Sequence, residues 1–451
     1  MVSSYVPGVY TQEESFTLTL EAAGPIYYTT DGSVPDAGDT LYEGPLNIGE
    51  TTVIRAVAIE EGKMAGDVYT ATFIVGDQHD IPVVSLVTDP ENLWGKKGIY
   101  RSGDITVKEI QVPGHVSYIG DDGSFAINCA INLHGATTVT AFDKKTFAVR
   151  FQDRFDGPLH YDVFGDGEVT SFASLLIRTA HESTYSSQMH DTFINALASQ
   201  ASDRILTQKY KYVALYLNGE YWGLYALRER HSPEHYASYR DVPADTVESV
   251  RHMIQEQNDL NTLFQMCLSG NLKSEAQYAF AKSVIDMESY VDWLIFEAYM
   301  SNVDVNYNVR FYRSSAEGIW RMGLADLDLG MMGSRGAFEQ MAECFHHGVL
   351  IEDLLANEEF QHLLATRLAE LLAGPLSDEN AIALINQMAD IIRSEAVWEE
   401  QRWGTPVRNW EYTISDMIGF CTGRAQAMID SACSAMRFTR EEREAYFGHL
   451  E

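Results

Sequence analysis

The sequence predicts an α+β fold that begins with a small β-sandwich. Short runs of alternating polar and apolar residues recur between residues 7 and 76, separated by Gly, Asp and Pro. Longer strand-like runs follow up to residue 229. Beyond that point apolar residues recur at intervals of three and four, which is the spacing of amphipathic helices. These observations predict a β-sandwich, a β-rich lobe and a helical lobe, in that order.

Length and charge limit the classes of partner. The chain has 451 residues, enough for two or three domains, and 45% of them are hydrophobic, as in ordinary globular proteins. Acidic residues outnumber basic ones by 65 to 32, which gives a formal net charge of −33. Because nucleic acids and anionic membranes are bound through basic surfaces, this charge argues against both as partners. An anionic nucleotide would need a metal ion and a local basic pocket.

The sequence gives no direct signal for a cellular compartment. It contains no run of about 18 apolar residues, so no membrane-spanning helix is predicted. The first residues lack the pattern of a signal peptide, so the protein is either cytosolic or the sequence lacks its export signal. Its cysteines are odd in number and scattered, which predicts neither disulfides nor a zinc site. They are Cys129, Cys267, Cys344, Cys421 and Cys433.

Residues 1–76 are predicted to form the sandwich, with strands over 15–20, 25–30 and 52–58. The sequences YYTTDGSVP at 27–35 and LYEGP at 41–45 closely resemble the chitobiase/β-hexosaminidase C-terminal-type domain, an immunoglobulin-like module of secreted bacterial proteins. This resemblance implies an extracellular or cell-surface location. Tyr27 and Tyr28 could stack on sugar rings, which would give the module a carbohydrate contact, but aromatic residues of small sandwiches usually belong to the core.

Residues 80–230 are predicted to form the β-rich lobe. Strands are expected over 81–88, 125–135, 144–151 and 174–178, and a helix over 186–201. A hairpin is expected over 212–227, because Asn218-Gly219 between two alternating apolar runs is a strong hairpin signal.

Residues 231–451 are predicted to form the helical lobe. Helices are expected over 289–300, 351–372, 379–392 and 413–436. The only strands expected in this half are one pair within residues 304–328, with acidic and amide residues at its ends.

The polar ends of this strand pair are candidates for a metal and phosphate site. Residues two apart in a strand share a face, so Asp326 and Asp328 could hold one cation. Mg²⁺ takes a few such oxygens and leaves other positions to water and phosphate. Asp304 lies outside that pair and could accept a proton from an attacking hydroxyl. The alternative is a simple turn, since Asp and Asn are common turn residues.

Two other groupings are weaker. His346 and His347 lie near Cys344 and Glu343, but adjacent histidines cannot easily share one ion. Paired carboxylates also serve glycoside hydrolysis, although neighbours on one strand face suit a cation better than opposite sides of a sugar bond. An enzyme acting on polysaccharide is a remote alternative, suggested only by the proteins in which the N-terminal module is usually found.

The order and spacing of several motifs resemble the spore-coat-protein CotH kinase-like family. The motifs are IPVVSL at 81–86, LHG at 133–135, KK at 144–145, LLIR at 175–178, LNGEYWGLY at 217–225, RER at 228–230, DLDLG at 326–330, LLANEEF at 354–360 and QRW at 401–403. This resemblance implies an atypical protein-kinase-like two-lobed fold. It also implies a secreted enzyme that uses ATP and Mg²⁺, or Mn²⁺ or Ca²⁺, to phosphorylate Ser or Thr of an extracellular or surface protein.

The resemblance assigns roles to individual residues. Asp304 resembles the catalytic Asp, and the predicted metal ligands are Asp328, Asn308 and Asp326. Lys145 resembles the lysine that contacts the α- and β-phosphates, since Lys144 on the same strand points the other way.

The same resemblance implies roles for three further residues. Asp191 would pair with the lysine in the place where ordinary kinases use Glu. Thr137 and Thr138 would contact phosphate in a loop that lacks the usual glycines. Because the chain departs from the family pattern here and at His190, a catalytically weak pseudokinase that serves as a surface scaffold or adhesion protein is the second interpretation.

Overall fold

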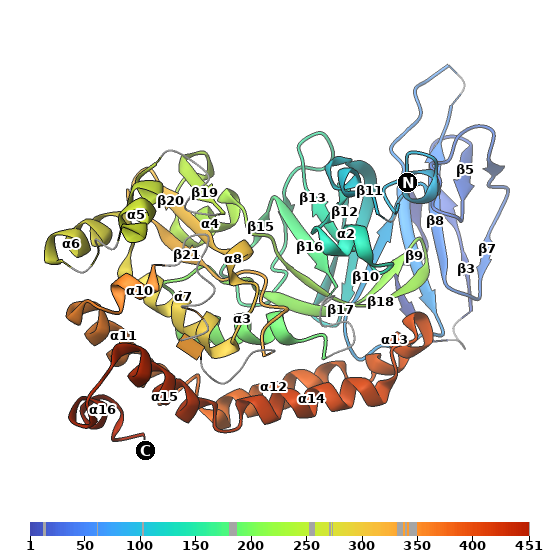
Figure 1. Ribbon diagram of the computed structural model, residues 1–451. Helices are drawn as coiled ribbons and strands as arrows, with labels where there is room; N and C mark the ends of the chain where they lie inside the picture. Colours follow the sequence, from blue (N-terminus) through green and yellow to red (C-terminus); the bar gives the residue numbers. More distant parts are fainter. Residues whose placement is uncertain are drawn as a thin grey trace. The chain divides into compact units, whose positions relative to one another are not determined.

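The computed structural model of the chain is shown in Figure 1. It describes residues 1–11, 15–60, 62–101, 103–179, 187–251, 258–269, 272, 274–331, 337–338, 341 and 350–450. The chain forms two compact units. The first comprises Met1–Thr179, Tyr210–Arg228 and Ile391–Val407, and the second comprises Ala180–Lys209, Glu229–Asp390 and Arg408–Glu451. Within the described ranges, no helix is long and apolar enough to cross a membrane.

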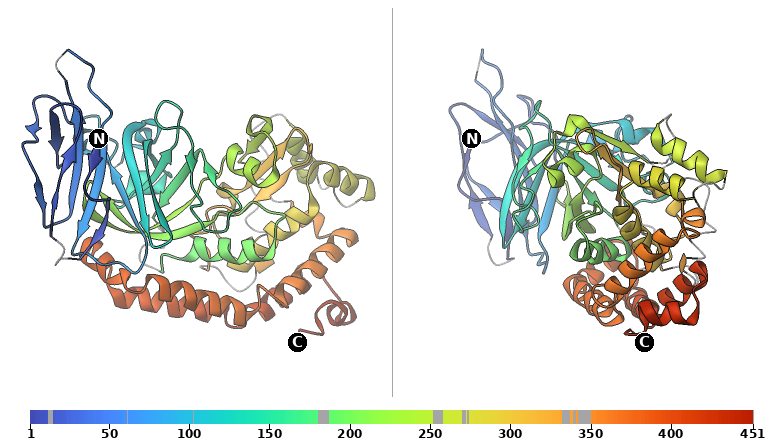
Figure 2. Two further views of the ribbon diagram at one scale, coloured as in Figure 1. Left: turned by 180° about the vertical axis from the view of Figure 1, so that it is seen from behind. Right: turned by 90° about the vertical axis from the view of Figure 1, so that its left-hand side faces the viewer.

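The first unit begins with the predicted β domain, whose strands lie beside the barrel strands of the same unit in both views of Figure 2. One sheet has the order β2 (Gly8–Tyr10), β9 (Tyr69–Val75), β8 (Thr52–Ala58), β5 (Ile26–Thr29) and β6 (Thr40–Leu41). Two smaller sheets pair β3 (Phe16–Leu18) with β7 (Leu46–Ile48) and β1 (Val2–Ser3) with β4 (Leu20–Glu21). Phe16, Ile54 and Phe73 belong to one buried core, and Tyr28 packs against it. The strands predicted over 25–30 and 52–58 are confirmed, whereas the one predicted over 15–20 is divided into β3 and β4, which belong to different sheets.

A closed barrel makes up most of the rest of the first unit. Its strands are β10 (Val83–Val87), β11 (Val112–Gly120), β12 (Gly123–His134), β13 (Thr146–Arg150), β16 (Ser174–Arg178), β18 (Glu220–Glu229) and β17 (Tyr210–Leu217). Parallel pairing of β10 with β17 closes the ring. The predicted hairpin is confirmed: Asn218 and Gly219 have φ of +49° and +86°, as a type I′ turn requires. The closure itself was not predicted, because it joins strands far apart in the sequence.

Short elements complete the first unit. They are α1 (Pro90–Trp94), the 3₁₀ helix η2 (Ile105–Glu109), α2 (Thr137–Ala141), β14 (Leu159–His160), β15 (Ser171–Phe172) and α13 (Glu395–Trp403). The loop expected at Thr137 and Thr138 is in fact the helix α2. Side-chain hydroxyls support this turn, since Thr138 Oγ1 donates to the His134 carbonyl at 2.8 Å.

The second unit is mainly helical around one small sheet. Its helices are α3 (His190–Ala201), α4 (Pro233–Arg240), η3 (Ala244–Thr246), α5 (Asp259–Leu268), α6 (Glu275–Val284), α7 (Met287–Met300), α8 (Val305–Asn308), α10 (Ile351–Leu354), α11 (Glu358–Leu372), α12 (Asp378–Ile392), α14 (Val407–Cys421), α15 (Arg424–Met436) and α16 (Arg440–Phe447). α12 and α14 each extend by one or two residues into the first unit's ranges. α7 is buried along nearly its whole length and contacts α3, α11, α15 and a strand of the sheet. This helix forms the centre of the unit.

Two helix predictions in this unit need correction. The helix expected over 351–372 is divided into α10 and α11, because Asn357 caps α11 by accepting a hydrogen bond from Phe360 N at 3.1 Å. The helix expected over 413–436 is divided into α14 and α15 at Gly423, whose φ of +72° ends the first helix.

The sheet of the second unit has three strands, not the two predicted. They are β19 (Val247–Val250), β20 (Arg310–Ser314) and β21 (Arg321–Gly323), with β20 in the middle. β19 was missed because only its two end residues are buried, so its four residues show no period of two.

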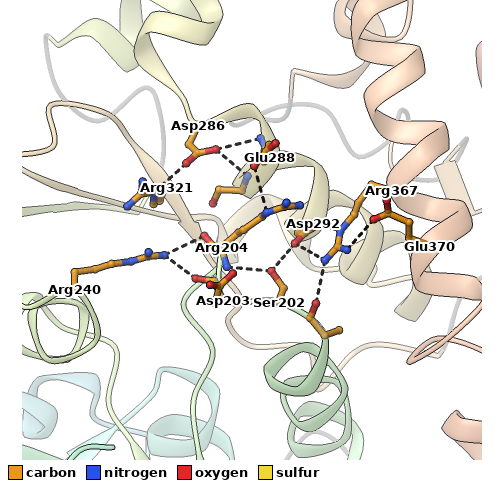
Figure 3. A network of polar contacts seen from close by, with 12 residues as sticks. Ser202, Asp203, Arg204, Arg240, Asp286, Glu288, Asp292, Arg321, Arg367 and Glu370 are labelled. Carbon is orange, nitrogen blue, oxygen red and sulfur yellow. Dashed lines mark hydrogen bonds and ion pairs between the residues drawn. The ribbon is translucent and has the colours of Figure 1, made fainter.

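A network of ion pairs connects the elements around α7 (Figure 3). Arg367 of α11 donates to both carboxylate oxygens of the buried Asp292 on α7, at 2.6 and 3.1 Å. The same guanidinium donates to the Ala201 carbonyl at the end of α3, at 3.0 Å. Arg321 of β21 pairs with Asp286, which caps α7, at 3.0 Å. These contacts fix α3, α7 and β21, the elements from which the candidate site is built.

Candidate functional site

Asp304 and Asn308 lie at the two ends of the short helix α8, directly after α7. Asn308 Nδ2 donates to Asp304 Oδ2 at 3.0 Å. The sequence predicted a strand end here, but β20 begins only at Arg310. The helical turn brings residues four apart onto one side, which allows the amide to meet the carboxylate.

The backbone of Asp304 is held by a short chain of hydrogen bonds that starts inside α7. The buried Glu297 accepts a hydrogen bond from Asn302 Nδ2 through Oε2 at 2.9 Å. Asn302 Oδ1 in turn accepts a hydrogen bond from Asp304 N at 3.1 Å. Glu297 therefore positions Asp304 through an amide side chain.

Asp326 and Asp328 lie in the segment that follows β21, outside any strand. The prediction that a strand places them on one face is wrong, because Asp326 has a left-handed φ of +65°. Gly330 closes the segment against α7: a Cβ there would lie 2.6 Å from Met300 Cε. The glycine of the DLDLG motif thus lies close to the Met300 side chain, whose end would have to move to admit a larger residue.

The first turn of α3 fastens this segment. Asp191 Oδ1 accepts a hydrogen bond from Leu327 N at 2.8 Å. The buried His190 imidazole donates to the Asp328 carbonyl, and burial lowers the pKa of His190 to about 4. His190 is therefore neutral near pH 7. Both side chains hold the backbone that carries the predicted metal ligands.

The carboxylates of the site repel one another. Burial raises the pKa of Asp304, and the charge of Asp326 raises it further, while Asn308 and Arg251 lower it. Burial raises the pKa of Glu297 to about 8, with the Asn302 hydrogen bond opposing and the charges of Asp191 and Asp326 adding to the rise. Negative charge is therefore concentrated around Asp326.

The donors of this site fit a hard divalent cation in their chemistry. They are carboxylate and amide oxygens, and a cation would relieve the repulsion between Asp304 and Asp326. Among the residues that the structure describes, no three side chains of His, Cys, Asp or Glu are grouped so that they could hold a metal by themselves. Asn308 and phosphate oxygens would therefore have to complete a coordination shell.

The two lysines lie in the first unit and are both buried. Lys144 Nζ pairs with Glu399 Oε1 at 2.7 Å and donates to the Leu224 carbonyl at 2.8 Å. Lys145 Nζ donates to the Val139 carbonyl at 2.8 Å. Burial lowers the pKa of each ammonium, and a carboxylate opposes the shift, Glu399 for Lys144 and Asp143 for Lys145. Because Asp191 belongs to the second unit, its pairing with Lys145 stays a prediction, as does phosphate contact by Thr137 and Thr138.

Sequence reasoning missed several residues of the site. Glu297 lies in the run of apolar residues that forms α7, and an acidic residue in such a run is a signal that could have revealed it. Asn302 and Arg310 lie in the predicted strand-and-turn stretch, but the sequence assigned no role to them or to Arg251. The grouping of His346 and His347 with Cys344 and Glu343 lies outside the described residues.

Comparisons with known proteins place this chain in a class and then in a family. The chain has an α+β fold, with a β domain at the N-terminus and a helical C-terminal region, and its sequence matches two family models. The model described as CotH kinase protein matches residues 131–428, and the chitobiase/β-hexosaminidase C-terminal domain matches residues 6–70. The chain is thus a kinase-like protein. The first match covers more than half of it, so the chain belongs to the CotH kinase protein family, and both resemblances expected from the sequence are confirmed. A search of the curated proteins gives no match.

Proposed function

We propose that this chain is a protein kinase that transfers the γ-phosphate of ATP to Ser or Thr of a protein outside the cell or at its surface. The observation that carries the proposal is Asp304, a half-buried carboxylate with a raised pKa that is oriented by Asn308 and lies within electrostatic reach of Asp326. Membership of the CotH kinase protein family supports it. The proposal includes a kinase-like two-lobed arrangement of residues 80–230 and 231–451.

Asp304 is suited to the role of proton acceptor. A raised pKa makes its carboxylate a stronger base than an ordinary surface aspartate. In the proposed reaction the substrate hydroxyl gives its proton to Asp304, and its oxygen bonds to the γ-phosphorus. The bond from that phosphorus to the β–γ bridging oxygen breaks and ADP leaves. Glu297 and Asn302 keep the Asp304 backbone in place.

Asp328, Asn308 and Asp326 would hold a divalent ion, Mg²⁺ or alternatively Mn²⁺ or Ca²⁺. When bound, it would neutralise phosphate charge. Asp191 and His190 would keep the ligand segment in position through its backbone. Lys145 stays the proposed contact of the α- and β-phosphates.

The other parts of the proposal concern location and partners. The chitobiase-type domain supports an extracellular or surface location and leaves a carbohydrate contact open for residues 6–70. The formal charge of −33 supports a protein as substrate over nucleic acid or a membrane surface.

Calorimetric titration tests the proposal. ATP is titrated into the full chain with Mg²⁺, Mn²⁺ or Ca²⁺, and the titration is repeated with Asp328→Ala. We expect metal-dependent binding that the variant loses. Asp304→Asn serves as the matched control, because it should bind ATP like the wild type but transfer phosphate much more slowly. Absence of binding with all three metals would overturn the kinase proposal and favour a surface scaffold.

A further inference from the structure

Two arginines lie opposite each other at one end of the sheet in the second unit. β19 and β20 are antiparallel, and their paired register ends with Val250 opposite Phe311. Continued by one residue, this register puts Arg251, which directly follows β19, opposite Arg310. On its other side Arg310 pairs with Gly323 of β21. Directly opposite residues of an antiparallel pair share a face. The end of the sheet therefore presents two guanidinium groups next to a residue without a side chain.

The other two arginines of this sheet are matched by carboxylates. Arg313 pairs with Asp259 at 2.6 Å and Glu248 at 3.0 Å. Arg321 pairs with Asp286 at 3.0 Å and also with Glu317. In contrast, Nη1 of Arg310 is buried and has no hydrogen-bond partner in the described part of the chain. Within the described residues, the lack of a hydrogen-bond partner for Nη1 thus distinguishes Arg310 from Arg313 and Arg321 in the same sheet.

The charges near the Arg310 guanidinium also differ from those of an ordinary ion pair, because one of them is positive. Arg310 feels the like charge of Arg251 and the opposite charge of Asp326. Like charges directly opposite in a sheet are destabilising. An anion between the two groups would remove this cost and supply acceptors for the buried donor.

The arginine pair adjoins the candidate catalytic residues. Arg251 Nη2 donates to Asn308 Oδ1 at 3.0 Å, and Asn308 donates to Asp304. Arg310 lies two residues after Asn308 and within electrostatic reach of Asp326. An anion held by the pair would lie beside the proposed proton acceptor and a proposed metal ligand.

We propose that Arg251 and Arg310 bind a phosphate group, and that in the reaction this group is the phosphoryl group being transferred. The second part rests on the function proposed above. The planar guanidinium suits this role, because it donates two parallel hydrogen bonds to phosphate oxygens and stays charged at any physiological pH. The two residues would act at the γ-phosphate, whereas Lys145 is proposed for the α- and β-phosphates.

The first experiment measures binding of inorganic phosphate to the full chain without nucleotide or metal, by calorimetry. We expect the wild type to bind and Arg310→Gln and Arg251→Gln each to weaken binding about tenfold or more. Arg313→Gln is the matched control, since it removes the same charge from the opposite face of β20 and should leave phosphate affinity unchanged. Circular dichroism checks that each variant is folded, and Arg310→Lys should recover part of the affinity. No phosphate binding by the wild type, or equal losses in Arg310→Gln and Arg313→Gln, would overturn the proposal.

A second measurement assigns the phosphate. With Mg²⁺ present, Arg310→Gln should weaken binding of a non-hydrolysable ATP analogue but leave ADP affinity unchanged. Equal losses for both nucleotides would overturn the γ-phosphate assignment. If the wild type binds inorganic phosphate through the arginines but binds no ATP with any metal, the kinase proposal fails and the phosphate site stands. If ATP binding needs Asp328 but Arg310→Gln leaves phosphate and nucleotide affinities unchanged, the phosphate site fails and the kinase proposal stands.

Discussion

Glu399 in the first unit and Glu297 in the second are both buried glutamates on helices, but their surroundings differ. Glu399 meets the Lys144 ammonium at 2.7 Å and also accepts a hydrogen bond from Leu224 N. Glu297 meets the amide of Asn302 at 2.9 Å and feels the further negative charges of Asp191 and Asp326. The cation beside Glu399 offsets the cost of burying its charge, whereas the like charges near Glu297 add to that cost. Glu399 thus belongs to a buried ion pair, whereas Glu297 lies among like charges close to the candidate site.

The backbone of β18 packs closely against the Lys144–Glu399 ion pair. Gly223 of β18 has φ of +127°, and a Cβ there would lie 2.4 Å from Glu399 Oε1 and 3.1 Å from Lys144 Cε. The strand approaches the ion pair so closely that only glycine fits. In the second unit, Glu297 lies near the like charges of Asp191 and Asp326, and Arg310 lies near the like charge of Arg251 as well as the opposite charge of Asp326.

The largest effect is expected from breaking the matched pair. Lys144→Ala leaves Glu399 buried without its cation, so the unfolding free energy should fall by about 3–5 kcal/mol. Denaturant unfolding measures this fall. The double variant Lys144→Met, Glu399→Leu removes both charges and should recover part of the loss. If Lys144→Ala were as stable as the wild type, the buried pair would not be a structural element.

Removing the carboxylate of Asp304 should affect activity more than stability. Asp304→Asn keeps the size of the side chain and an oxygen for the hydrogen bond from Asn308, but it cannot accept a proton. We expect phosphate transfer to fall by about 10²–10⁴-fold, the usual contribution of a general base. A radiolabel transfer assay measures the rate. Because burial and Asp326 disfavour the charged form of Asp304, the variant should be at least as stable as the wild type at pH 7, and a large loss of stability would contradict this account.

Glu297 should make the stability of the second unit depend on pH. Its pKa is about 8 in the folded protein, above the ordinary value of 4.5, so the folded state binds more protons between these values. The unfolding free energy should therefore fall as the pH rises from about 4.5 to 8. Glu297→Gln removes this slope and should be more stable than the wild type at pH 9, by on the order of a few kcal/mol, and similar to it near pH 4.

Denaturant unfolding of the wild type and of Glu297→Gln at pH 4, 7 and 9 gives the difference between their unfolding free energies at each pH. The other carboxylates titrate equally in the two proteins and cancel. An unchanged difference across this range would show that Glu297 is charged in the folded state and has a compensating partner.

Local patterns in the sequence predicted much of the fold but little of the site geometry. The alternating runs and the Asn218-Gly219 turn depend on neighbouring residues, so the hairpin could be predicted. The partner of Lys144 lies 255 residues away in the chain, and no local pattern announces it. The DLDLG motif located Asp326 and Asp328, but the left-handed Asp326 placed them differently from a strand. The arginine pair was missed because β19 is too short to show a pattern.

The smallest effect concerns the two kinds of arginine on one sheet. Arg310→Gln relieves the repulsion with Arg251, so without ligand the unfolding free energy should rise by about 0.2–1 kcal/mol. Arg313→Gln loses partly exposed ion pairs with Asp259 and Glu248, so it should lower that free energy by up to about 1 kcal/mol. Saturating phosphate should stabilise the wild type and the Arg313 variant more than the Arg310 variant, because only a folded protein with the intact pair binds it tightly. Thermal melts with and without phosphate measure these shifts. Equal responses of the two variants would mean that charge matching does not separate structural from ligand-binding arginines on this sheet.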